Sequence, residues 1–323
     1  MKGNKVWPIW LFVVLTVMTS LSAFGAGKEA KYPAKPIKIL IPEGPGGTND
    51  VPTRALAKAM EKILGQPVVC INMPGGTGTR VLTELQKEKP DGYVIGSVSP
   101  GTIIAALSTK ADFSVARDFT HLVKYQIHPN PVAVKKDAPW NSWEDFLKDA
   151  RTRKEPMKIG MWGSRSFACM GLEQIARKEN VTFTYVPFNS TGEAMSSILG
   201  GHTDVTTGSS GIMYSKEGGT LKTLLLFSSR RIKDLPGVPT ASEKGYSGLG
   251  LTGGFSWLVA PKGLPGPALK TLQDAVKKGI QDEEYLKLLA KYDLIPDGMS
   301  GKEFDDELKT LEAQIGELLK QMK

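Results

Sequence analysis

Short apolar runs rich in β-branched residues alternate with amphipathic segments along most of the chain. In the first half, residues 37–41, 68–71 and 93–98 have the composition of strands buried in a sheet. After the first strand, apolar residues recur every three or four positions, which predicts a helix that begins at Asp50 and ends at Gly65. Alternating strands and helices predict a parallel α/β sheet.

The same alternation returns in the second half, and two amphipathic helices close the chain. The expected elements are strands at 158–161, 182–186, 203–206 and 221–227, and helices at 167–178, 192–199, 267–281 and 302–322. No repeat of about 20–50 residues is visible, so a solenoid is excluded.

The most apolar stretch, residues 7–18, follows Lys2 and Lys5 and precedes small residues that include Ala23. This order is typical of a cleavable export signal, which we assign to residues 1–26. A membrane anchor that stays attached is the alternative. Because no cysteine lies near the cleavage site, we expect no lipid anchor, and we expect the mature protein in the periplasm.

The 323 residues are 41% hydrophobic and 23% charged, which suits a globular chain of about two domains. Collagen, long disorder, a disulfide scaffold and a multi-span membrane protein are excluded. The net charge of +8 is scattered without a basic stripe, so we expect no nucleic-acid partner. Cys70 and Cys169 could pair in an oxidising compartment, although a free thiol is the commoner state for the apolar run around Cys70.

Four turns that lead from a strand into a helix are rich in Gly, Ser, Thr and Asn. A helix start exposes unpaired N–H groups and a partial positive charge, and glycine lets the backbone approach a ligand, so these turns suit a small anion. The alternative is that each turn needs these residues for its own geometry. The turns occupy residues 42–50, 72–78, 162–166 and 188–191.

Motifs of nucleotide-binding and catalytic proteins are missing from the sequence. The turns contain neither the P-loop ending nor the G-x-G-x-x-G spacing, and no G-x-S-x-G elbow occurs. The histidines stand outside zinc-binding patterns, so we expect surface or capping roles for them, no metal and no other cofactor. They are His121, His128 and His202. No nucleophile, base and orienting acid are assembled, which favours a binding protein over an enzyme.

Short strings along the chain, in a fixed order and spacing, resemble the tripartite tricarboxylate transporter substrate-binding proteins, the TctC or Bug family of extracytoplasmic solute receptors. The resemblance runs from Tyr32 to about Lys320. Each string is weak alone, but their order is specific. The strings include Pro45-Gly46-Gly47-x-x-Asp50, Asn72-x-Pro74-Gly75-Gly76-x-Gly78, Pro90-Asp91-Gly92-Tyr93, Val186-Pro187-Phe188, Pro236-Gly237-Val238-Pro239-Thr240 and Trp257-x-Val259-Ala260-Pro261.

The resemblance implies a two-lobed, type II-like periplasmic-binding-protein fold with a ligand cleft between the lobes. Lobe one would hold residues 28–124 and 246–323, and lobe two residues 125–245. It implies a monomer that binds a small mono- or dicarboxylate and delivers it to the membrane permease of a tripartite tricarboxylate transporter. A receptor that presents its ligand to a sensor kinase is the first alternative, and a secreted α/β hydrolase or lyase is the second.

The same resemblance implies that backbone groups and ordered water of the turns hold the ligand carboxylate. The implied residues are Pro45, Gly46, Gly47, Thr48, Asn49, Asp50, Asn72, Pro74, Gly75, Gly76 and Thr77 in lobe one, and Ser164, Arg165, Ser166, Phe188, Asn189, Ser190, Thr191 and Asp204 in lobe two.

Several positions depart from the family pattern or have two interpretations. Glu43 and Arg165 stand where an apolar residue and a glycine are usual. Arg165 is either a surface residue or a bidentate clamp on a second ligand carboxylate. For Asp50 we favour an N-cap of the helix that it begins over a direct ligand contact. Three aromatic residues are either cavity walls or core: Trp162, Phe167 and Phe188.

Overall fold

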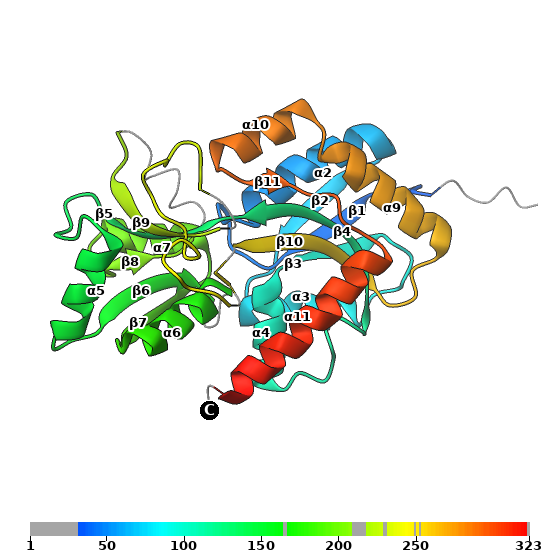
Figure 1. Cartoon of the computed structure of the whole chain (residues 1–323). Coiled ribbons are helices and arrows are strands. Elements are labelled where there is room, and N and C mark those ends of the chain that lie inside the picture. The colour runs from blue at the N-terminus through cyan, green and yellow to red at the C-terminus, as the bar shows by residue number, and fades with distance from the viewer. Residues whose placement is uncertain are drawn as a thin grey trace, which may run out of the picture.

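The computed structural model describes residues 32–163, 167–208, 218–228, 231–248, 250–251 and 253–321. These residues form two β-sheets that lie side by side, each packed between helices (Figure 1). The export signal expected at residues 1–26 lies outside the described residues.

The first sheet combines parallel and antiparallel strands. Its order is β11 (Ile295–Pro296), β4 (Phe119–His128), β10 (Gly254–Pro261), β3 (Val94–Val98), β1 (Ile37–Ile41) and β2 (Val68–Asn72). β1 runs parallel to β2 and β3, whereas β10 is antiparallel to β3 and β4, and β11 is antiparallel to β4.

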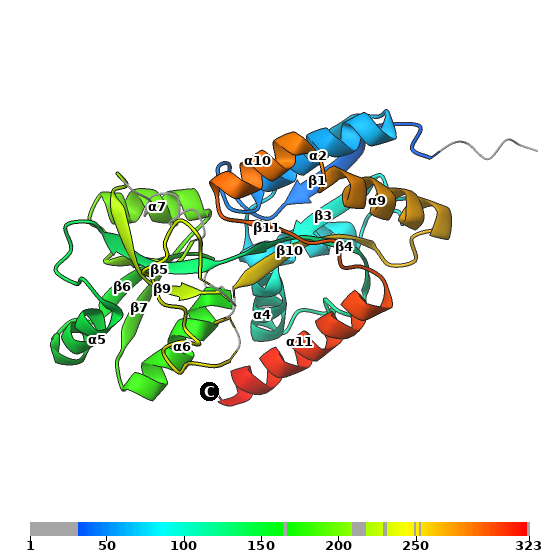
Figure 2. The same ribbon diagram turned by 45° about the horizontal axis from the view of Figure 1, so that its top comes forward.

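Helices cover both faces of this sheet (Figure 2). α2 (Asp50–Leu64), α9 (Gly266–Gly279) and α10 (Glu283–Lys291) lie on one face, and η1 (Gly76–Gly78), α3 (Thr79–Leu85), α4 (Pro100–Thr109) and α11 (Lys302–Gln321) on the other. Ile39 and Ile41 of β1 belong to the first core and Leu40 to the second, because successive side chains of a strand point to opposite faces.

The second sheet has the order β7 (Phe183–Phe188), β6 (Met157–Trp162), β8 (Val205–Thr206), β5 (Asn130–Lys135) and β9 (Leu221–Phe227). β6 is parallel to β7 and β8, and β5 is antiparallel to β8 and β9. α5 (Trp143–Thr152) and α6 (Phe167–Glu179) pack in the main core, and α7 (Thr191–Leu199) packs with the smaller cluster around Ala133.

The predicted parallel pairing is confirmed for β1, β2 and β3 and for β6, β7 and β8, but both sheets also contain antiparallel strands that were not predicted. The chain leaves the first sheet through β4, whose end is one residue from the start of β5, and it returns from the second sheet through β10. Two strands that carry the chain out and back must run in opposite directions. The predicted strands at 37–41 and 221–227 and the end of α2 at Gly65, which has a left-handed φ of 67°, are confirmed.

A buried cation ties β4 to the C-terminal helix. Lys124 is 5% exposed, and its ammonium lies 2.9 Å from Glu307 and 3.7 Å from Asp297. We expect Lys124→Ala to lower the free energy of unfolding by about 2 kcal/mol, because the two carboxylates lose their partner. A thermal melt should fall by several degrees, whereas Lys287→Ala, at an exposed ion pair, should change little. Equal effects of the two variants would contradict this role.

Candidate functional site

A cavity of about 50 Å³ lies between the two sheets. Its walls come from segments that follow parallel strands and from the starts of α2, α4, α6 and α7, which is where open α/β sheets bind ligands. The lining residues are Glu43, Thr48, Asn49, Ser99, Pro100, Gly101, His128, Asn130, Trp162, Phe167, Ala168, Thr191, Thr207 and Gly208.

The turn at residues 42–50 and the turn at residues 188–191 contact each other, although they belong to different sheets. Thr191 at the start of α7 accepts a hydrogen bond from the Thr48 amide at 2.9 Å, and the two hydroxyl groups lie 3.0 Å apart. The Gly44 amide donates to the Asn189 carbonyl at 3.2 Å. Of the predicted ligand residues, Thr48, Asn49 and Thr191 therefore share one cavity, although they come from different sheets.

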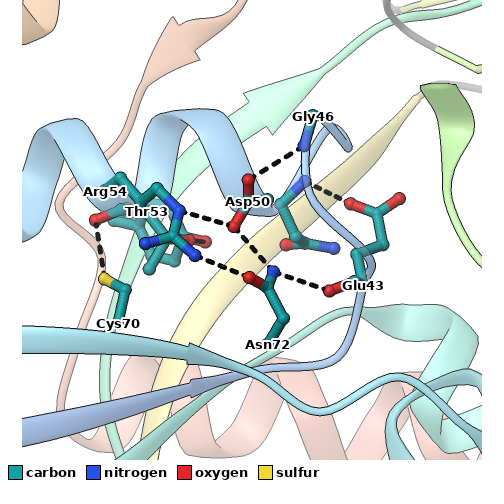
Figure 3. Close-up of polar contacts among 9 residues, drawn as sticks. Glu43, Gly46, Asp50, Thr53, Arg54, Cys70 and Asn72 are labelled. Atoms are coloured by element: carbon teal, nitrogen blue, oxygen red, sulfur yellow. Dashed lines mark hydrogen bonds and ion pairs between the residues drawn. The ribbon is translucent and has the colours of Figure 1, made fainter.

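Asp50 organises the first turn, but the N-cap interpretation was wrong (Figure 3). Asn49 is the N-cap residue and already has helical dihedral angles, so the Asp50 carboxylate, inside the first turn, folds back over the loop. It accepts hydrogen bonds from the Gly46 amide at 2.9 Å, the Asn72 amide group at 2.7 Å and Arg54 Nε at 2.8 Å. Asp50 is 3% exposed and does not line the cavity.

Other predicted residues of the first sheet support the turn from outside the cavity. Asn72 also donates to the Glu43 carbonyl at 2.8 Å. Thr77 is buried against Gly163, where an added Cβ would overlap the threonine hydroxyl. Two glycines of the first turn border a smaller, adjacent cavity. Besides Asp50, the predicted residues of this sheet that do not line the main cavity are Pro45, Gly46, Gly47, Asn72, Pro74, Gly75, Gly76 and Thr77.

In the second sheet, the start of α7 is well formed. The Ser190 hydroxyl caps the helix by accepting a hydrogen bond from the Glu193 amide at 3.1 Å, and the Glu193 carboxylate accepts one from the Asn189 amide at 3.0 Å. Phe188 packs beside Gly160 instead of lining the cavity. These contacts hold Thr191 in place.

Trp162 and Phe167 do line the cavity, so the two aromatic residues serve as walls. Phe167 also packs against the core shared by α4 and α11, which makes it both wall and core. Ser164, Arg165 and Ser166, which lie between them in sequence, fall outside the described residues.

The structure places Asp204, an expected ligand residue, away from the described cavity. Its carboxylate accepts a hydrogen bond from the Lys158 amide at 2.8 Å and lies 3.8 Å from the Arg153 guanidinium. Asp204 precedes β8, whereas the cavity is lined by Thr207 and Gly208, which follow this short strand. The residue therefore stabilises the opposite end of the strand.

The start of α4 belongs to the site and was missed. Ser99, Pro100 and Gly101 line the cavity directly after β3. A serine followed by a proline after a strand is a helix-start signal, with Ser99 at the N-cap and Pro100 at the first helical position. The missed signal was therefore present in the sequence.

The histidines are more buried than expected. His128 lines the cavity at the end of β4, and His121 accepts a hydrogen bond from the Trp257 indole at 3.1 Å. Burial lowers the pKa of each to about 4, so both are neutral at pH 7. The surface or capping prediction was wrong for these two residues.

Glu43 is the acidic residue of the described cavity wall. Its side chain is fully buried, and Oε2 accepts a hydrogen bond from the Asn49 amide at 2.6 Å (Figure 3). Burial raises its pKa to about 8, while nearby backbone amides partly offset this effect. Because Glu43 and His128 are then mostly uncharged at pH 7, the helix starts dominate the electrostatics of the described wall.

Three further observations concern the described residues. They contain no group of three or more His, Cys, Asp or Glu side chains placed to hold a metal ion. Cys70 and Cys169 are not joined by a disulfide and belong to different cores. Within the described part of the chain, no helix combines the length and apolar character needed to cross a membrane.

Two sheets joined by two crossing segments, with a cavity between them, define a two-lobed binding protein of the periplasmic-binding-protein type. The family model of the tripartite tricarboxylate transporter family receptor, TctC, matches residues 53–322. The UPF0065 protein in the gbd 5′ region of Cupriavidus necator is 30% identical over 290 residues, which are 90% of this chain and 88% of that protein.

Solved structures agree with this assignment. A TctC solute-binding protein from Polaromonas is 27% identical with a TM-score of 0.67, and covers 90% of this chain and 99% of its own. MatC from Rhodopseudomonas palustris, solved with malate, shares the fold at 24% identity with a TM-score of 0.79, covering 89% and 99%. A second R. palustris protein, solved with adipate, shares it at 23% with a TM-score of 0.81, covering 90% and 97%.

The chain belongs to the TctC family of tripartite tricarboxylate transporter receptors. It is therefore a solute-binding receptor and not an enzyme.

Proposed function

We propose that this receptor binds a small mono- or dicarboxylate between its two lobes and delivers it to the membrane permease of a tripartite tricarboxylate transporter. The observation that carries the proposal is the convergence of the starts of α2, α4, α6 and α7 on one cavity. Each helix start offers unpaired N–H groups and a partial positive charge to an anion.

Non-covalent contacts alone can supply the binding free energy of such a complex. A hydrogen bond to a charged group contributes about 1.5–3 kcal/mol, and a helix start adds about 0.3–1 kcal/mol. A few such contacts, after ordering costs, reach the roughly −8 kcal/mol of a micromolar complex. The malate and adipate bound to structural neighbours support a carboxylate as the ligand class.

The lobes of this proposal follow the two sheets. We therefore move the proposed boundaries from 124/125 and 245/246 to the end of β4 at His128 and the start of β10 at Gly254, because Tyr246 and Leu251 pack in the core of the second sheet. Among the residues implied by the family resemblance, we assign Thr48, Asn49 and Thr191 to the ligand, with the start of α4 added. Export through residues 1–26 would place the receptor in the periplasm.

A thermal-shift panel tests the proposal. Malate, adipate, glutamate and benzoate would be compared with glucose and spermidine on the mature chain. A ligand at 100 times its Kd stabilises by about 2.7 kcal/mol, which raises the melting temperature by several degrees for a chain of this size. A response to glucose or spermidine and to none of the acids would contradict a carboxylate receptor.

A further inference from the structure

Glu43 places a carboxyl group at the proposed anion site, beside the backbone N–H groups of the helix starts. It follows β1, its side chain is 0% exposed, and it lines the cavity with the starts of α2, α4 and α7. Oε2 accepts a hydrogen bond from the Asn49 amide at 2.6 Å, and the backbone amides of Thr191 and Asp50 also face the carboxyl group. Oε1 is buried, and no donor among the described residues reaches it in good hydrogen-bond geometry. A buried polar atom without a partner is rare, and here the space beside it is a ligand cavity.

The charges around Glu43 do not favour its ionised form. Asp50 on α2 repels a second negative charge, and the Arg54 guanidinium on the same helix is bound to Asp50 and Asn72. His128 on β4 is neutral, and the lining residues of α4 and α7 carry no charge. The described part of the cavity wall contains no lysine or arginine. If Glu43 were ionised, a bound carboxylate would therefore lie beside a second negative charge. No lysine or arginine of the described wall would neutralise either charge.

The hydrogen-bond pattern fits a neutral carboxyl group. A protonated carboxyl has one carbonyl oxygen that accepts and one hydroxyl that donates. With Oε2 as the carbonyl oxygen on the Asn49 amide, Oε1 becomes a hydroxyl donor at the cavity. The raised pKa of about 8 agrees with this state at neutral pH.

We propose that Glu43 acts in its protonated form and donates Oε1–H to a ligand carboxylate, so that the receptor holds its anion only while Glu43 carries a proton. The inference rests on the proposed carboxylate-binding function and names the residue that makes binding pH-dependent. A bound anion stabilises the protonated form of Glu43 further, so binding above pH 8 takes up a proton from solution.

Calorimetry with malate and adipate at pH 6, 7, 8 and 9 tests the proposal on the wild type and Glu43→Gln. Glutamine keeps the acceptor for the Asn49 amide and the donor at the Oε1 position, but it does not titrate. The wild type should lose about tenfold in affinity between pH 7 and pH 9, with proton uptake at pH 9, whereas Glu43→Gln should keep one affinity throughout. Glu43→Leu, which lacks a donor, should bind more weakly at every pH.

The pH dependence of the melting temperature without ligand tests the protonation of Glu43 independently. Because burial raises the pKa of folded Glu43 from 4.5 to about 8, the native state holds more protons than the unfolded state in this window, and stability falls as pH rises through it. The melting temperature of Glu43→Gln should match the wild type near pH 5 and exceed it by several degrees at pH 8. Glu84→Gln, at a more exposed glutamate, should show no such trend.

The outcomes separate the two proposals. Acid binding with the same pH profile in the wild type and Glu43→Gln would overturn the role of Glu43 and leave the carboxylate receptor standing. Tighter binding by the wild type at high pH would overturn it too, because an ionised Glu43 would then accept a hydrogen bond from the ligand. Failure of every acid to bind either variant at any pH would contradict both proposals.

Discussion

Replacing Asp50 by alanine should weaken carboxylate binding by about 100-fold, although Asp50 does not line the cavity. Its buried carboxylate accepts hydrogen bonds from Gly46, Asn72 and Arg54 and holds the first turn against β2. Gly46 lies on the turn itself, and Asn72 lies beside it at the end of β2. Loss of these two hydrogen bonds corresponds to about 3 kcal/mol, since hydrogen bonds to charged groups contribute about 1.5–3 kcal/mol each.

The effect on binding arises because the relaxed turn no longer holds Thr48 and Asn49 in their places in the cavity wall. Affinity would be measured by calorimetry well below the melting temperature, which should itself fall by several degrees. Arg54→Ala is the matched control, because Arg54 touches the same carboxylate but its side chain is 45% exposed. An Asp50→Ala protein that binds as tightly as the Arg54→Ala protein would contradict this role.

Replacing Thr191 by valine should weaken carboxylate binding by at least tenfold, because it removes a contact between the two sheets. Valine has nearly the same shape but removes the acceptor of the Thr48 amide and the contact between the two hydroxyl groups, which join the sheets across the cavity. The Thr48 amide is then left without its partner in a partly buried position, which opposes closure of the lobes on the ligand.

Calorimetry and small-angle scattering together would test the Thr191→Val prediction. Affinity should fall, and the ligand-saturated protein should remain more open than the wild type. Thr184→Val, at an exposed position of β7, should change neither quantity. Unchanged affinity with unchanged scattering would show that the Thr48–Thr191 contact has no part in closure.

The sequence predicted elements with regular local patterns. β1 and β9 follow mostly apolar runs, and α2 combines an apolar face with a glycine end. β4 was not predicted, because its buried polar residues interrupt the pattern. Their partners are distant in sequence: Lys124 binds Glu307, and Gln126 donates to the Thr48 carbonyl at 3.3 Å.

α4 was missed for the opposite reason. Residues from Pro100 to Ala106 are buried on all sides between the first sheet and α11, so the helix lacks the polar face that produces a helical period. The candidate site was predictable only where its residues belong to a local sequence signal. Thr48 and Thr191 stand in turns that the sequence itself indicates. The position of Asp204 at the other end of β8 depends instead on Lys158, which is distant in sequence and adjacent in the sheet.

The most direct test of the account is a crystal structure of the mature protein with an acid from the panel bound. We expect one ligand carboxylate in the cavity, within hydrogen-bond distance of backbone N–H groups at helix starts from both sheets, including α2 or α4 on one side and α6 or α7 on the other. A ligand bound outside this cavity, or one that contacts a single sheet, would contradict the account.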